Sequence, residues 1–208
     1  MIFTSCNVLF LCTGNSARSI LAEAILERMG SDQFTAYSAG SFPRGEIHPA
    51  ALNLLKDLGH RTDHLRSKSW DEFTGASAPQ IDFIFTVCDN AATETCPIWS
   101  GQPMTVHWGL PDPAAVEGSD DDVAQAFSAT YQQLSKRIST FIQLANDSTD
   151  NAELRSRLVV TEPSIVQSTP KTAFSHADAR EFARLKRHFE PYNERLSQEM
   201  GVPLEAWQ

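Results

Sequence analysis

The 208-residue sequence predicts an α/β domain with a mostly parallel sheet, and three observations lead to this fold class. Short apolar runs of strand length alternate along the chain with amphipathic segments of helix length. The first run, residues 7–12, is almost continuously apolar, as expected for a strand buried on both faces. Proline and glycine residues mark the expected helix ends. Parallel strands joined through helices imply right-handed crossovers.

Each element is placed from its local pattern. The strands are expected at residues 7–12, 34–40, 81–88 and 104–108. A first helix is expected over residues 17–30, where apolar side chains recur on one side until a glycine ends the pattern. A second helix is expected over residues 49–59, with proline in its first turn. A long third helix is expected to begin at a cap on Ser119 or Asp120.

The chain is expected to divide into three parts. Residues 1–145 form the α/β domain. Residues 146–174 are rich in Asn, Asp, Ser, Thr and Pro, which is typical of a linker. Residues 175–208 regain helical spacing, with Phe182, Leu185 and Phe189 on one stripe, and predict a helical C-terminal extension of unknown role.

Composition excludes several classes of protein. The net charge of −9 argues against non-specific nucleic-acid binding. No apolar run approaches the roughly 20 residues that a membrane-spanning helix needs. The first residues lack the basic region of a signal peptide, so a cytoplasmic protein is expected. There, four cysteines are expected to be thiols rather than structural disulfides. No histidine or cysteine spacing predicts a metal site.

The loop after the first strand predicts an oxyanion site. Cys12 ends the strand, and Arg18 and Ser19 open the helix. Backbone N–H groups of such a loop, together with the helix dipole, attract an anion, and the Arg18 guanidinium can hold two of its oxygens. The expected oxyanion-binding residues are Thr13, Gly14, Asn15, Ser16, Ala17 and Arg18.

The same positive field is expected to lower the pKa of Cys12 and make it a nucleophile at neutral pH. Ser19 is placed to donate a hydrogen bond to its sulfur. The alternative is a buried structural cysteine, with Arg18 on a solvated helix face.

Three reactive groups are expected at one edge of the sheet. Cys12 and Cys88 end the first and third strands, and Asp112 follows the fourth. The carboxyl ends of parallel strands share one edge, where open α/β folds bind ligands. Asp112 is a candidate general acid, or else a turn aspartate between two prolines. A polar segment separates Cys88 from Cys96, which suits disulfide exchange; otherwise Cys88 is a core residue and Cys96 has no role.

These residues resemble the arsenate reductases related to low-molecular-weight protein tyrosine phosphatases, over roughly residues 7–145. The resemblance rests on Val8 to Ser19, Ser38 to Gly40, Ser67 to Trp70, Val87 to Asn90, Thr95 to Pro97 and His107 to Pro113. It implies a three-layer sandwich with a four-stranded parallel sheet, like that of the low-molecular-weight phosphatases.

The resemblance also implies a reaction. Cys12 attacks arsenate and forms a thiol–arsenic adduct, held by Arg18 and the loop amides, while Asp112 handles the proton. Cys88 then attacks Cys12 and arsenite leaves. Cys96 next attacks Cys88, and thioredoxin reduces the resulting disulfide. No bound cofactor is implied. Glutaredoxin with glutathione, or mycothiol, is an alternative reductant, because the interval from Cys88 to Cys96 is slightly longer than in the best-known thioredoxin-coupled members.

Some relatives also bind a monovalent cation near the residues that match Asn15, Glu23 and Ser38. Two other functions stay open. A tyrosine phosphatase would use the same Cys12, Arg18 and Asp112, but Ala114 stands where such phosphatases usually carry an aromatic residue. A non-catalytic module that binds an oxyanion or a partner is the other alternative.

Overall fold

The computed structural model describes residues 5–93, 97, 99, 102–161 and 166–167, all within a compact unit that spans residues 1–169. The expected C-terminal extension and Cys96 therefore lie outside the described residues. The strands are β1 Cys6–Cys12, β2 Phe34–Gly40, β3 Phe83–Thr86, β4 Met104–His107 and β5 Val166–Gln167. The helices are α1 Arg18–Gly30, α2 Pro49–Asp57, α3 Asp89–Thr93, α4 Asp120–Asn146 and α5 Asn151–Thr161, with 3₁₀ turns η1 Trp70–Phe73 and η2 Pro113–Ala115.

The sheet has strand order β2-β1-β3-β4-β5, and its first four strands are parallel. This confirms the expected four-stranded parallel sheet. β5 adds a short antiparallel edge strand, pairing with β4, that the sequence analysis did not expect. The register aligns Cys12 with Gly40, Leu11 with Thr86, and Thr86 with His107. The ends of the four parallel strands therefore meet at one edge.

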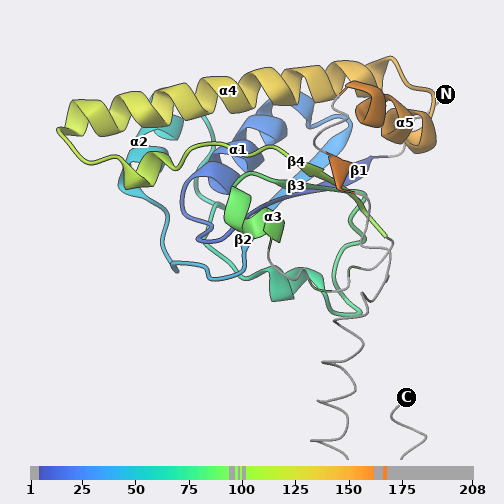
Figure 1. Ribbon diagram of the computed structural model, residues 1–208, viewed down its shortest axis with the longest axis horizontal. Coiled ribbons are helices and arrows are strands. Elements are labelled where there is room, and N and C mark those ends of the chain that lie inside the picture. Colours follow the sequence, from blue (N-terminus) through green and yellow to red (C-terminus); the bar gives the residue numbers. More distant parts are fainter. Residues whose placement is uncertain (1–4, 94–96, 98, 100–101, 162–165, 168–208) are drawn as a thin grey trace, which may run out of the picture. The chain divides into compact units, whose positions relative to one another are not determined.

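Helices cover one face of the sheet, and turns and loops cover the other. Figure 1 shows α1, α2 and α4 on the same side of the sheet, with the segment around residue 70 on the opposite side. On the helical side, the core includes Ile20, Phe85 and Phe141, none of them more than 1% exposed. A smaller apolar cluster around Leu11 and Phe73 covers the second face. Because both faces are covered, β1 is a continuous apolar strand.

The helix starts follow from local capping. Ser119 caps α4, accepting a hydrogen bond from the Asp122 amide, and the Asp122 carboxylate bonds back to the Ser119 amide. This capping box confirms the cap expected at this position. In α2, His48 takes the cap position and Pro49 the first turn. By contrast, no side chain caps the start of α1.

Helix α5 lies inside the segment for which the sequence predicts a linker. The polar residues that suggested a linker instead cap this helix: Asp150 Oδ1 accepts hydrogen bonds from the Ala152 and Glu153 amides, each at 2.9 Å. Leu154 and Leu158, one turn apart, are 0% and 3% exposed. Residues 151–161 therefore belong to the packed unit, whereas the sequence analysis assigned them to the linker because of their polar neighbours.

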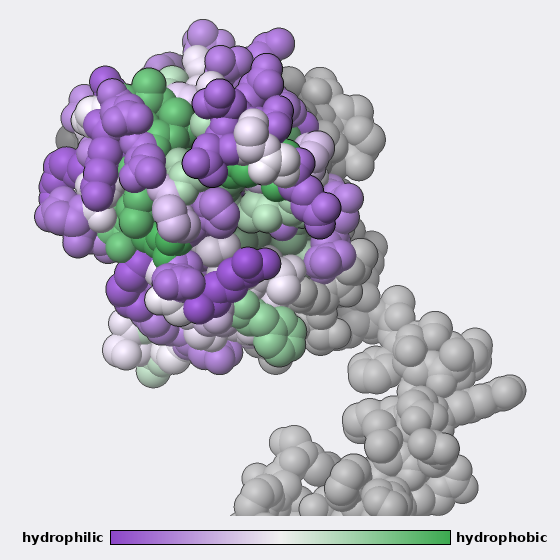
Figure 2. Space-filling model, turned by 90° about the vertical axis from the view of Figure 1, so that its left-hand side faces the viewer, coloured by the Kyte–Doolittle hydropathy of each residue, from purple (hydrophilic) through white to green (hydrophobic). Residues whose placement is uncertain are grey.

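On the face drawn in Figure 2, hydrophilic residues predominate and hydrophobic residues show in small patches between them. Among the described residues, no helix is long and apolar enough to cross a membrane.

We expect Leu154→Ala to lower the free energy of unfolding by about 2–5 kcal/mol, because it leaves a cavity beneath α5. Denaturant unfolding of the full chain measures this loss. Val159→Ala, at a position 46% exposed on the same helix, is the control and should change stability by less than about 0.5 kcal/mol. Equal effects of the two substitutions would show that α5 does not pack as described.

Candidate active site

The loop between β1 and α1 forms the floor of a pocket at the carboxyl edge of the sheet. The pocket brings together groups from the four loops that follow the parallel strands. Its lining residues are Cys12, Thr13, Gly14, Ser16, Ala17, Arg18, Phe42, Arg44, Cys88, Asp89, Asn90, Leu110, Pro111 and Asp112. Thus Cys12, Cys88 and Asp112 converge as the sequence predicts. Cys96 lies outside the described residues.

The shape of the loop is fixed from its outer side. The amides of Phe42, Arg44 and His48 donate hydrogen bonds to the carbonyls of Thr13, Gly14 and Ser16, at 2.9, 3.0 and 2.9 Å. In a trans peptide the N–H group points away from the carbonyl of the same peptide. Because these carbonyls face the loop after β2, the N–H groups of the same peptides face the pocket. The uncapped start of α1 adds the amides of its first turn. The backbone is therefore arranged as an anion cradle.

Two residues allow the loop after β1 to take this shape close to β2. Asn15 has φ +40°, a left-handed conformation that asparagine tolerates better than most residues. Gly40, at the end of β2, lies against the loop: a Cβ atom there would stand 2.5 Å from the Thr13 carbonyl oxygen and 3.0 Å from the Asn15 nitrogen. Any larger residue at position 40 would push the loop out of shape.

The side chain and the backbone N–H of Asn15 make different contacts. Its side chain is fully buried and does not line the pocket. It donates to Ser19 and Ser38 at 2.9 Å each and accepts from the Lys68 amide at 2.7 Å. Only its backbone N–H turns toward the reaction centre, 3.2 Å from the Cys12 sulfur. Asn15 therefore braces the loop from inside the protein.

Cys12 is buried beneath the cradle. Its sulfur lies 3.0 Å from Ser19 Oγ. Because Ser19 Oγ already accepts a hydrogen bond from Asn15, its hydroxyl hydrogen is available to the sulfur. Burial raises the pKa of the Cys12 thiol above its ordinary value, while the Ser19 hydrogen bond and the charge of Arg18 lower it. The expected lowering of the Cys12 pKa is wrong for this structure, since desolvation outweighs the two stabilising groups.

Arg18 reaches from the first turn of α1 to the loop after β4. Its guanidinium donates to the Leu110 carbonyl at 2.9 Å and forms an ion pair with Asp112 at 3.0 Å. Its Nε–H, although buried, has no hydrogen-bond partner among the described residues. Arg18 thus joins the cradle to the segment that carries Asp112, and one of its donors remains for an anion.

Cys88 also lines the pocket. It is 4% exposed, and its sulfur lies 3.7 Å from Thr13 Oγ1. The Ala91 amide, in the first turn of α3, donates to this sulfur at 3.4 Å. Cys12 and Cys88 are both free thiols, close enough that the charge of Cys88 contributes to raising the pKa of Cys12.

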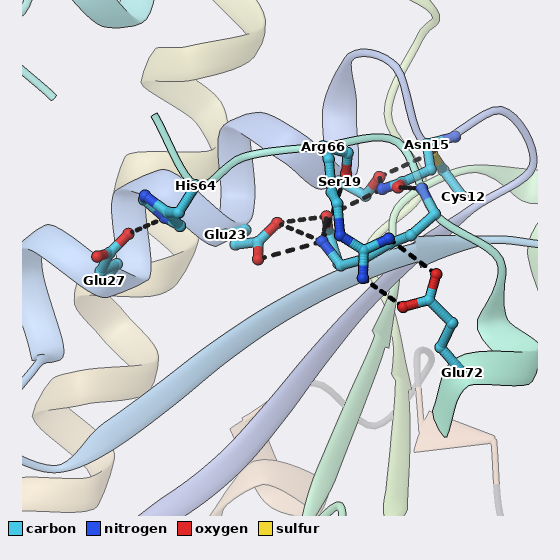
Figure 3. Close-up of polar contacts among 10 residues, drawn as sticks. Cys12, Asn15, Ser19, Glu23, Glu27, His64, Arg66 and Glu72 are labelled. Atoms are coloured by element: carbon cyan, nitrogen blue, oxygen red, sulfur yellow. Dashed lines mark hydrogen bonds and ion pairs between the residues drawn. The ribbon is translucent and has the colours of Figure 1, made fainter. Parts of the chain in front are cut away.

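A chain of buried polar groups extends from Cys12 into the protein. Figure 3 shows Ser19 and Asn15 beside Cys12, and Glu23 farther along α1. Ser38 donates to Glu23 Oε2 at 2.5 Å, and the Lys68 ammonium lies 3.3 Å from the same oxygen and 3.5 Å from Ser38 Oγ. The structure therefore places a lysine side chain where the resemblance suggested a monovalent cation. The sequence analysis missed Lys68, because a lysine is normally exposed.

Other pocket residues were also missed. Phe42, which is 75% exposed, and Arg44 come from the loop after β2 and form the rim. Their positions follow from the hydrogen bonds that tie this loop to the cradle, which no local pattern reveals. Among the described residues, no group of three or more His, Cys, Asp or Glu side chains is arranged to hold a metal ion.

Ser19→Ala should shift the pH profile of Cys12 alkylation to higher pH. The Ser19 hydrogen bond stabilises the thiolate, so its loss raises the Cys12 pKa further and slows alkylation at neutral pH. The measurement is site-resolved labelling with neutral iodoacetamide across a pH series. Ser156→Ala, on the exposed side of α5, is the matched control. An unchanged pH profile for Ser19→Ala would show that this hydrogen bond does not stabilise the Cys12 thiolate.

Lys68→Met should destabilise the protein by roughly 3–5 kcal/mol at neutral pH, because it leaves the Glu23 carboxylate buried without its cation. Burial raises the pKa of Glu23, with the Lys68 charge opposing this rise, so the loss should shrink as pH falls and Glu23 takes up a proton. Denaturant unfolding measures both effects. Adding Glu23→Gln to Lys68→Met should restore much of the stability. A wild-type stability that rises specifically with potassium would contradict the assignment of Lys68 as the resident cation.

Comparison with known proteins identifies the family to which this fold belongs. The model of the family described as low molecular weight phosphotyrosine protein phosphatase matches residues 7–153. An arsenate reductase of Halalkalibacterium halodurans is 35% identical over 136 residues, which cover 65% of this chain and 94% of that protein. One of Bacillus subtilis is 30% identical over the same shares.

Solved structures show the same fold. One, described as an arsenate reductase in its oxidised state, superposes with a TM-score of 0.55 at 22% identity, covering 67% of this chain and 98% of that one. A low molecular weight protein tyrosine phosphatase from T. tengcongensis superposes with a TM-score of 0.52 at 23% identity, covering 67% and 99%. The chain belongs to the low molecular weight phosphotyrosine protein phosphatase family.

Proposed function

We propose that this protein is an enzyme that reduces arsenate to arsenite, with Cys12 as the nucleophile and Cys88 as the second thiol. The observation that carries the proposal is the buried Cys88 thiol on the wall of the oxyanion pocket that contains Cys12. Hydrolysis of a phosphate ester needs no second thiol there. The identity of 30–35% to proteins named arsenate reductase supports the same function.

The first step forms a bond between the Cys12 sulfur and arsenic. Arsenate binds in the cradle, where inward amides and Arg18 offset its charge. The sulfur attacks arsenic, one arsenic–oxygen bond breaks, and that oxygen leaves as water. Its two protons come from the Cys12 thiol and from the arsenate hydroxyl, and Asp112 at the pocket passes a proton to the leaving oxygen. Arsenic remains pentavalent in this adduct.

The second step transfers two electrons. The Cys88 thiolate attacks the Cys12 sulfur, and a disulfide bond forms between them. The sulfur–arsenic bond breaks with its electron pair on arsenic, which leaves as trivalent arsenite. Cys96 then attacks the Cys88 sulfur and releases Cys12 as a thiol. An external thiol reductant supplies two electrons and reduces the Cys88–Cys96 disulfide. We propose thioredoxin for this role, with glutaredoxin and glutathione, or mycothiol, as alternative donors.

Cys88→Ser should abolish multiple-turnover arsenite production yet retain oxyanion binding. The assay supplies arsenate with thioredoxin and its reductase, and in parallel with glutaredoxin and glutathione or with mycothiol. Binding is measured separately, as protection of Cys12 from iodoacetamide by phosphate. Cys6→Ser is the matched control, because Cys6 hydrogen-bonds Asn151 outside the pocket. Undiminished turnover by Cys88→Ser would exclude Cys88 from the mechanism.

Cys96→Ser should separate the last exchange from the earlier steps. It should release one arsenite per protein and then stop with Cys12 and Cys88 joined. Turnover with thioredoxin in wild type, and its loss in this variant, would support the proposed relay.

A further inference from the structure

We propose that His107 is a positioning residue that holds the Cys88 thiol in place for its attack on Cys12. This inference rests on the proposed function, since it concerns the second chemical step. His107 ends β4 and does not line the pocket.

The segment that carries Cys88 has little secondary structure to hold it. The last pair in the β3–β4 register is Thr86 with His107, and Cys88 follows two positions later. The Val87 amide still bonds to the Leu11 carbonyl at 2.8 Å, but helix α3, which begins at Asp89, has only five residues. A helix of this length is not stable without contacts from elsewhere. The position of the Cys88 sulfur therefore depends on side-chain anchors.

His107 supplies anchors on both sides of Cys88. Its Nδ1 lies 2.8 Å from Thr86 Oγ1, two residues before Cys88. Its Nε2 lies 3.1 Å from Asp89 Oδ1, one residue after Cys88. The imidazole thus bridges the two ends of the turn that presents the thiol.

The bridge is compatible with both charge states of the imidazole. In the neutral ring, Nε2–H donates to Asp89 and Nδ1 accepts from the Thr86 hydroxyl. In the protonated ring, both nitrogens donate, and Thr86 Oγ1 accepts instead. Because the contacts survive either way, the geometry points to a mechanical role rather than to proton transfer.

The loop that carries Asp112 also packs against this pair. A Cβ atom at Gly109 would stand 2.5 Å from Asp89 Oδ1 and 2.7 Å from His107 Nε2. Only glycine allows such an approach without displacing the pair. Gly109 therefore packs directly against the bridge, although the Asp89 side chain is 88% exposed on its other side. Because His107 bonds residues on both sides of Cys88, a shift of its ring would be transmitted to Cys88.

The test measures the second step alone, in full-length protein that carries Cys96→Ser. Reduced protein is mixed with arsenate without a reductant, quenched with N-ethylmaleimide, and analysed for the Cys12–Cys88 disulfide over time. Adding His107→Phe, which removes both hydrogen bonds, should slow disulfide formation by about ten- to a hundredfold, as expected for a misplaced reacting group. Thr86→Val, which removes one anchor with little change of volume, should slow it less.

Labelling of Cys12 by iodoacetamide, and its protection by phosphate, should be unchanged in both variants. Wild-type disulfide rates in both would overturn the inference, as would an equal slowing of disulfide formation and Cys12 labelling. If His107→Phe does not fold, Thr86→Val decides the matter by the same criteria. Failure of the Cys96→Ser protein itself to form the disulfide would refute the proposed function instead.

Discussion

The whole site depends on peptide carbonyls that are held facing away from it. Three carbonyls of the loop after β1 are bonded by amides of residues 42, 44 and 48, so the opposite faces of the same peptides present N–H groups to one centre. The positions of Cys12 at the end of β1 and of Arg18 at the start of α1 follow from this loop. In the proposed function, these N–H groups and Arg18 would attract an oxyanion locally, so the net charge of −9 does not argue against such binding.

Much of this arrangement could be predicted because it depends on local sequence patterns. Short segments of strand length located the four parallel strands, and their order brought Cys12, Cys88 and Asp112 to one edge. The predicted strand at 81–88 proved shorter, Phe83–Thr86, because the apolar pattern continues past the last ladder pair. Helix α5 was missed for the opposite reason, since capping residues and linker residues share the same composition.

Contacts between distant segments could not be predicted. Lys68 lies beside Glu23 only because the chain after α2 returns alongside the end of β2. His107 meets Thr86 only through the register of β3 and β4. The predicted direction of the Cys12 pKa shift was wrong, because the sequence reveals the charges near a sulfur but not how completely the sulfur is buried. A polar group inside the protein is costly unless it is paired, so such pairs depend on the finished fold.

The burial of both pocket thiols has a consequence for the flow of electrons. Cys12 and Cys88 are each only 4% exposed, so a bond between their sulfurs is shielded from the small thiols of the surrounding solution. In the proposed cycle, a third cysteine is then needed to take over the disulfide, so that the external reductant does not have to reach the bond between Cys12 and Cys88. In that cycle, such shielding would favour a reductant that reacts with the third cysteine over small thiols that need direct access to the pocket. It would also limit the access of dissolved oxidants to Cys12, the proposed nucleophile.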